Sequence, residues 1–123
     1  MMTTMDVGKK LVELCERGKN PKAIEALYSQ DILSIEPLSS GTIPNVTHGL
    51  DAVLQKTKTW LEKHDVHSSK TVGPFPHDDR FAVYFHHDVT QKASGKRIEM
   101  EEVAVYTVQN GKIVHEEFYH ESI

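Results

Sequence analysis

The stretch GKRIEMEEVAVYTVQNGKIVHEEFYH, residues 95–120, decides the class of fold. It contains two runs rich in strand-forming residues, 98–108 and 113–120, separated by a short turn around Asn110-Gly111. Both residues of this pair tolerate the positive φ angles of a two-residue hairpin turn. The stretch therefore predicts a β-hairpin of two long strands.

The rest of the chain divides into strands and helices around this hairpin. Alternating residues predict two more strands, 66–72 and 81–91, bounded by turns at 73–79 and 92–96. Apolar residues at helical spacing predict helices over 6–17, 21–30 and 50–64, with Asp6 as the first cap. A short strand is predicted at 32–36, followed by a long loop at 37–49; whether this strand joins the sheet stays open. The class is α+β, with three helices on one face of a curved, mainly antiparallel sheet.

Length and charge narrow the function classes. The 123 residues fit one domain, 1–123, with a core of ordinary size. Lys and Arg number 14 against 18 Asp and Glu, a net charge of −4 that disfavours nucleic acid as a partner. No apolar run is long enough for a membrane span or a secretory signal, and the single Cys15 favours a reducing compartment. We expect a cytoplasmic protein with no membrane partner.

Strand parity selects candidate functional residues. Residues two apart on a strand share a face, so His87 lies with Phe81, Val83 and Phe85 on an apolar face. A buried carboxylate needs a partner or a function, and a His beside carboxylates can transfer protons. The inward group that parity predicts is His87, Glu102, Glu117, Tyr119 and His115, with Glu36 and Trp60 nearby. The alternative, that Glu102 and Glu117 face solvent or pair with cations between subunits, stays open.

Metal and cofactor chemistry has little support in the sequence. His86 and His87 are adjacent on a strand and point to opposite faces, so they cannot share one ion without distortion. The glycines are scattered and form no phosphate-binding loop. We therefore expect neither a metal nor a cofactor.

Three segments carry a resemblance to a known family. They are residues 95–120, GPFPHDDRFAVYF at 73–85 and, more loosely, ILSIEP at 32–37. With the order helix, helix, strand, helix and four strands, the chain resembles the SnoaL-like group of the nuclear transport factor 2-like superfamily. The resemblance implies a cone-shaped, cystatin-like fold with a pocket at one end and dimers formed through the sheet.

The resemblance leaves two kinds of function open. The first is a cofactor-independent isomerase, cyclase or dehydratase, in which Glu117 or His87 takes a proton and Tyr119 or Glu102 stabilises the enolate. The second is a module of the same fold that binds a ligand or a protein without catalysis. Either would hold a small hydrophobic or carbonyl-containing ligand against a pocket wall formed by Glu36, Trp60, Phe85, Tyr106 and His115.

A homodimer is the expected partner arrangement. The strand 100–108 is apolar on both faces, with Val103 and Val105 on the face turned away from the helices. A monomer would expose this face, and a two-fold dimer would cover it.

Overall fold

The computed structural model describes residues 1–38 and 44–121, so part of the predicted loop at 37–49 lies outside the described residues. Within these ranges, the helices and strands follow one another along the chain in the expected order, with one additional short strand, β2, that the sequence did not predict. The elements are α1 (Thr4–Glu16), α2 (Asn20–Leu27), β1 (Tyr28–Ile35), β2 (Val46–His48), α3 (Leu50–Lys63), β3 (His64–His77), β4 (Arg80–Gln91), β5 (Arg97–Gln109) and β6 (Lys112–Tyr119).

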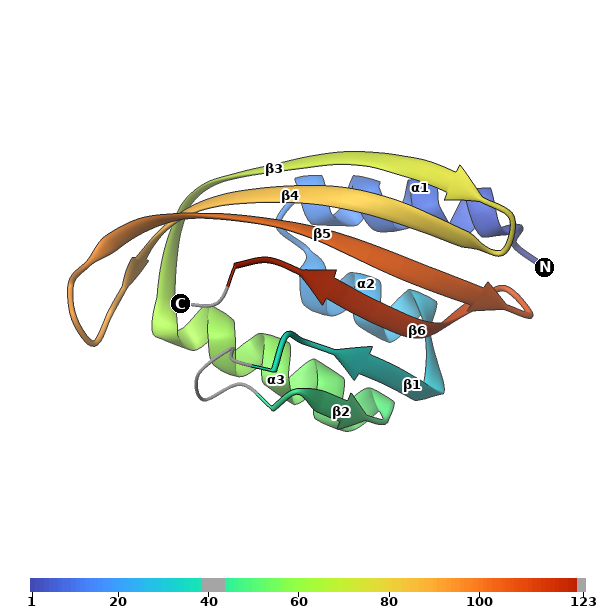
Figure 1. Cartoon of the computed structure of the whole chain (residues 1–123), viewed down its shortest axis with the longest axis horizontal. Helices are drawn as coiled ribbons and strands as arrows, with labels where there is room; N and C mark the ends of the chain where they lie inside the picture. Colours follow the sequence, from blue (N-terminus) through green and yellow to red (C-terminus); the bar gives the residue numbers. More distant parts are fainter. Residues whose placement is uncertain (39–43, 122–123) are drawn as a thin grey trace.

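The strands form a mixed, curved sheet with the helices on one side (Figure 1). Across the described residues the strand order is β2-β1-β6-β5-β4-β3. Every neighbouring pair is antiparallel except β1 and β6, which run parallel. The α+β prediction is confirmed, and the short strand β1 does join the sheet.

The first two helices differ from the prediction at their ends. The N-cap of α1 is Thr3, whose side chain accepts from the Asp6 backbone N–H while the Asp6 carboxylate accepts from the Thr3 N–H. Asp6 is thus the third residue of a capping box and not the cap. Helix α2 ends at Leu27, three residues earlier than predicted, because Tyr28 already has extended backbone geometry and begins β1.

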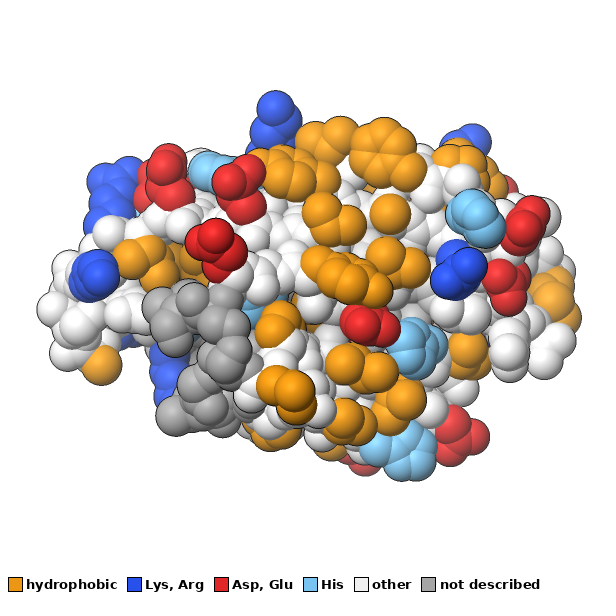
Figure 2. Space-filling view, viewed as in Figure 1, with side chains coloured by type: hydrophobic (Ala, Val, Ile, Leu, Met, Phe, Trp, Pro, Cys, Tyr) orange, Lys and Arg blue, Asp and Glu red, His pale blue; other side chains and the backbone are white. Residues whose placement is uncertain are grey.

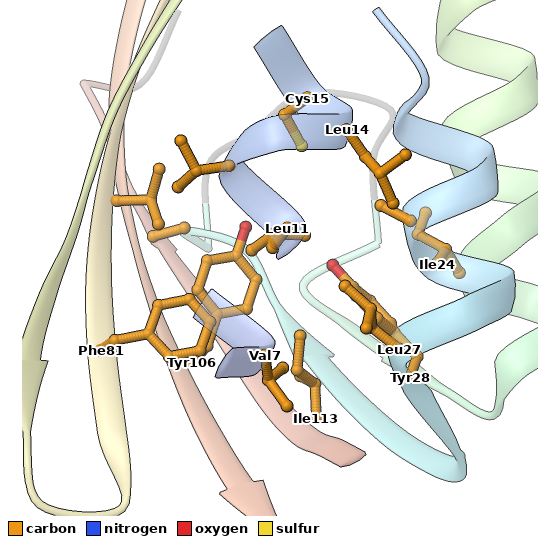
Figure 3. Close-up of a cluster of buried hydrophobic side chains, with 14 of the residues drawn as sticks. Val7, Leu11, Leu14, Cys15, Ile24, Leu27, Tyr28, Phe81, Tyr106 and Ile113 are labelled. Carbon is orange, nitrogen blue, oxygen red and sulfur yellow. The ribbon is translucent and has the colours of Figure 1, made fainter. Parts of the chain in front are cut away.

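The core lies between the helices and the inner face of the sheet. Figure 3 shows Val7, Leu11, Leu14 and Cys15 of α1 meeting Ile24 and Leu27 of α2 and the rings of Tyr28, Phe81 and Tyr106. Phe81 and Tyr106 stack with ring centroids 5.0 Å apart. The hydroxyl ends of Tyr28 and Tyr106 lie inside this core, so each needs a polar partner there.

The turn predicted at 73–79 is shorter in the structure. Strand β3 continues to His77 through Gly73, Pro74 and Pro76, and the chain reverses at Asp78 with φ of 55°. Proline is tolerated here because β3 is an edge strand and its register with β4 shifts between Val72 and Phe75. The hairpin turn at Asn110-Gly111 is confirmed, with φ of 51° and 74°.

A β-bulge in β6 decides which side chains of this strand face the helices. Val108 pairs with Ile113, but the next residue of β5, Thr107, pairs with His115, so the register skips Val114. The extra residue exchanges the two faces of β6 beyond this point. Glu116 consequently faces inward opposite Tyr106, and Glu117 lies opposite Val105 on the outer face.

Candidate functional site

Polar side chains collect at one end of the inner face of the sheet, beside α3. They come from the end of β1, from the middle of α3, from β5 and from the end of β6. We call this group the inner polar cluster: Ser34, Glu36, Lys56, Glu102, Glu116 and His120. The register that pairs Val103 with Tyr119 places Glu102 and His120 at the next position of the two adjacent chains.

Glu36 is the centre of the ion pairs in the cluster. Its Oε1 lies 3.6 Å from Lys56 Nζ and its Oε2 lies 3.1 Å from His120 Nε2, with both partners largely buried. Lys56 Nζ also donates to Ser34 Oγ at 2.8 Å and lies 5.6 Å from the centre of the Phe118 ring. The ammonium group is therefore fixed by an ion pair, a hydrogen bond and a cation–π contact.

Glu116 is the most deeply buried acid of the cluster, with 2% of its surface exposed. Burial raises the pKa of its carboxyl, while the hydroxyl of Tyr28, the Lys56 charge and Ser34 oppose the rise. Tyr28 donates its hydroxyl hydrogen to Glu116 Oε1. Burial, followed by the charge of Glu116, holds the pKa of Tyr28 well above its usual range, so Tyr28 remains a donor. Tyr28 and Glu116 are thus buried polar groups that satisfy each other's hydrogen bonding.

Glu102 is partly buried opposite Phe85 and lacks such a partner. Among the described residues, no hydrogen-bond donor or cation contacts its carboxylate. Burial, followed by the charge of Glu36, raises the pKa of Glu102 to about 7. His120 and Lys56 act in the opposite direction but do not reverse the shift. Glu102 therefore exchanges a proton near neutral pH, which a general acid or base requires.

An aromatic group lines the inner face next to Glu102. Trp60 of α3 stacks on His64 with centroids 4.2 Å apart, and His87 lies 5.9 Å from Trp60 and 6.0 Å from Phe85. His87 Nδ1 is 2.8 Å from Ser69 Oγ. Burial, followed by the charge of His86, lowers the pKa of His87, which favours the neutral imidazole.

A pocket of about 280 Å³ opens where β1 and β6 end. Glu36, Phe118 and His120 line it, so it reaches the inner polar cluster. A wider groove of about 530 Å³ lies between the end of α3 and the turn after β4, lined by Glu62, Lys63, His64, Gln91, Lys92, Ala93 and Ser94.

The structure brings together some of the predicted site residues. Glu36 and Glu102 lie in the inner polar cluster, and Trp60, Phe85 and His87 form the aromatic group beside it.

The structure separates three others from this group. Glu117, Tyr119 and His115 lie on the outer face, because the bulge at Val114 exchanges the faces of β6. Glu117 and Tyr119 nevertheless contribute to the lining of the 280 Å³ pocket at the end of β6. The shared hollow predicted for Glu102, Glu117 and Tyr119 is therefore wrong for the last two. Tyr106 faces inward but is 2% exposed within the hydrophobic core, so it does not line the pocket.

Parity alone missed the other members of the cluster. Counting alternate residues places Glu116 and His120 on the outer face of the last strand, whereas the structure has them on the inner face. Helical periodicity places Lys56 on the polar face of its helix, whereas the structure has it in contact with Glu36 and Ser34. One signal was available: Glu116, Phe118 and His120 also alternate, and Phe118 is as suitable for an inner face as Tyr119.

The helices on the concave side of this six-stranded sheet define the nuclear transport factor 2-like class, also called cystatin-like. The pattern of the SnoaL-like domain family matches residues 2–120, and the chain belongs to that family.

Solved structures agree with this class. A protein from Mesorhizobium loti, provisionally named a SnoaL-like polyketide cyclase, is 42% identical, with a TM-score of 0.90 over 97% of this chain and 100% of its own. A protein of unknown function from Burkholderia pseudomallei shares the fold at 18% identity, with a TM-score of 0.79 over 99% of this chain and 93% of its own. A Bacillus subtilis protein provisionally named an isomerase shares the fold at 15% identity, with a TM-score of 0.78 over 98% of this chain and 90% of its own. No curated protein matches the sequence. Within the described part of the chain, no helix is both long and apolar enough to cross a membrane.

Proposed function

We propose that this chain binds a small carbonyl-containing molecule at the inner polar cluster and isomerises, cyclises or dehydrates it without a cofactor. Glu102 is the proton-transfer group. The observation that carries the proposal is the Glu102 carboxyl itself: it faces inward, no cation among the described residues contacts it, and burial raises its pKa to about 7. Perturbed acids of this kind concentrate at functional sites.

The chemistry is proton transfer next to a carbonyl group. Ionised Glu102 takes the proton from the carbon beside the carbonyl, and the electron pair of the broken C–H bond moves to the carbonyl oxygen. The nearest donors for that oxygen are Lys56 and His120, which lie in the same cluster. Return of the proton from Glu102 to another carbon completes an isomerisation with no net change in protons or electrons.

The aromatic group supplies the apolar wall for the ligand. The rings of Trp60, Phe85 and His87 stand beside Glu102 and present flat faces of low polarity. A neutral His87 fits this role, because a charged imidazolium would cost free energy in this desolvated position and would lower the pKa of a nearby carboxyl group such as Glu102. We therefore assign His87 to ligand packing and Glu102 to proton transfer.

Hydrogen–deuterium exchange tests the proposal without knowledge of the natural substrate. A panel of cyclic and open-chain β-dicarbonyl compounds and β,γ-unsaturated ketones is incubated in D₂O with the protein, and loss of the carbon-bound proton is followed by NMR. We expect accelerated exchange of at least one compound, increasing with pH through a midpoint near that of Glu102. Removal of a general base typically costs about 10² to 10⁴ in rate, which is the loss expected for Glu102→Gln.

The matched control is Glu101→Gln, the same substitution one residue earlier on the opposite face of β5. It should retain the exchange activity. Binding of a compound without accelerated exchange in the wild-type protein would favour the non-catalytic alternative, a ligand-binding module. Equal exchange by wild type and Glu102→Gln would refute the role given to Glu102.

We further propose that the outer face of the sheet binds a second copy of the chain. The helices lie behind the sheet in the view of Figure 1, and Figure 2 shows hydrophobic side chains gathered in a band across the middle of the front face. Val103 is 40% exposed and its neighbour on β6, Tyr119, is 52% exposed. Partly exposed Ala82, Tyr84 and Val105 continue the band on β4 and β5.

Sedimentation of the wild-type protein tests this arrangement. We expect a dimer at micromolar concentration and a monomer for Val103→Glu, because two like charges would be buried at the centre of a two-fold interface. Substitution of an exposed valine away from the band, Val66→Glu, is the control and should leave the dimer intact. A monomeric wild-type protein would contradict the proposal.

A further inference from the structure

The inner polar cluster contains more carboxyl groups than cations. Glu36, Glu102 and Glu116 stand against Lys56 and His120. Which carboxyl group the two cations contact decides which of the three acids is held ionised.

The geometry assigns both cations to Glu36. One carboxylate oxygen of Glu36 faces Lys56 Nζ at 3.6 Å and the other faces His120 Nε2 at 3.1 Å. The third donor contact of the cluster, from Lys56 to Ser34 Oγ at 2.8 Å, further fixes the ammonium group on the β1 side. Within the described ranges, Glu102 has no cation within ion-pair distance, although Glu102 and His120 are the residues next to the paired Val103 and Tyr119.

We propose that Glu36 is a positioning residue, which keeps Lys56 and His120 away from the Glu102 carboxyl and so leaves Glu102 free to exchange its proton. This inference rests on the proposed function of Glu102 and names the residue on which that function depends. Glu36 acts through Glu102 and through the two cations, and it takes no part in the proton transfer.

The electrostatics of the cluster support this role from each element around Glu102. Burial and then the charge of Glu36, from the end of β1, raise the pKa of Glu102, and Glu116 of β6 adds to the rise. His120 beyond β6 and Lys56 of α3 lower it. On β4 the facing side chain is the uncharged Phe85, with His87 one position further along the same face.

The backbone holds Glu36 in place independently of its carboxylate. Its N–H donates to the Asn45 carbonyl at 2.8 Å, and the Asn45 side-chain amide donates to the Glu36 carbonyl. Glu36→Gln therefore removes the charge and leaves both backbone contacts available. Without that charge, Lys56 and His120 are left with Glu102 and Glu116 as their nearest acids.

The experiment follows the Glu102 carboxyl directly, with no substrate. The side-chain carboxyl carbons of all glutamates are labelled with ¹³C, and the Glu102 signal is identified by its disappearance in Glu102→Gln. We expect its titration midpoint to move toward acid by about 1 to 3 pH units in Glu36→Gln, the range that an opposite charge at close distance produces. In the control Glu101→Gln the Glu102 midpoint should not move.

A second variant has the opposite expected sign. In Lys56→Met the cluster loses a cation while Glu36 keeps its charge, so the Glu102 midpoint should rise. A midpoint that stays unchanged in Glu36→Gln, or that falls in Lys56→Met, would overturn the inference. The proposed function fails separately, if Glu102→Gln leaves carbon-acid exchange unaltered, whatever the titrations show.

Discussion

The substitution Glu102→Gln should reverse its effect on stability as the pH changes. The pKa of the Glu102 carboxyl rises from 4.5 in an unperturbed chain to about 7 in the folded protein. Between these values the folded protein keeps a proton that the unfolded chain has lost, so the free energy of unfolding falls as the pH rises. Glutamine stays neutral at every pH and has nearly the same shape.

The size of the effect follows from the shift. A change from 4.5 to about 7, at about 1.4 kcal/mol per pH unit, corresponds to about 3 kcal/mol. The difference in unfolding free energy between Glu102→Gln and the wild-type protein should therefore increase by about 3 kcal/mol from about pH 4 to about pH 8, in favour of the variant. Other groups titrate in this range, but they are common to both proteins and cancel in the difference.

Urea unfolding at a series of pH values measures this difference. Trp60 is the single tryptophan and stacks close to the site, so its fluorescence reports the loss of structure there. Glu101→Gln controls for the loss of a glutamate from β5 and should not reproduce the slope. A difference between Glu102→Gln and wild type that is independent of pH would refute the burial argument for Glu102.

Three further outcomes follow from the buried polar groups. Tyr28→Phe leaves Glu116 without its hydroxyl donor and should lower the free energy of unfolding by about 1 to 3 kcal/mol, measured by urea denaturation. Burial opposes protonation of His120, but its hydrogen bonds to the Glu121 carbonyl and the Glu36 carboxylate, together with the charges of Glu102 and Glu36, raise its pKa overall. In urea denaturation, His120→Gln should therefore lower the free energy of unfolding below about pH 6.5, and this loss should become smaller as the pH rises. Burial, followed by the charge of Glu116, raises the pKa of Cys15 to about 12, so a thiol reagent should modify it at neutral pH only after unfolding.

The sequence predicts the fold better than it predicts the site, and the hairpin at Asn110-Gly111 shows why. The turn is local: two adjacent residues tolerate positive φ, and both adopt it. The long period-two runs on either side make the strand assignment equally local. The pairing of Val108 with Ile113 follows from this turn and could be predicted.

The faces of β6 could not be predicted by the same argument. Continued without a bulge, the hairpin register would place Glu117 opposite Ala104 on the inner face, as parity counting expected. The single residue that the register skips, Val114, exchanges Glu117 for Glu116. Val114 is a β-branched residue directly after another, Ile113, and neither its type nor its neighbours mark it as the site of a bulge.

Lys56 illustrates a second limit of pattern reading. Helical periodicity places lysines on the solvent side, and a buried ammonium without a partner is unfavourable. Its burial becomes acceptable only because Glu36 and Ser34, which precede it in the chain by two elements, contact it at the end of β1. Such a partner depends on tertiary structure, and single-sequence patterns do not contain it.

The two inward acids of the hairpin differ in a way that separates structure from function. Glu116 is deeply buried but has the Tyr28 hydroxyl as donor, so its burial is largely compensated within the fold. Glu102 is less buried, yet no donor among the described residues compensates its carboxylate, so its ionisation near neutral pH costs stability. A glutamine would relieve this cost at the same position with the same shape, so packing alone gives no reason for a carboxyl group there. A group that must gain and lose a proton near neutral pH does give one.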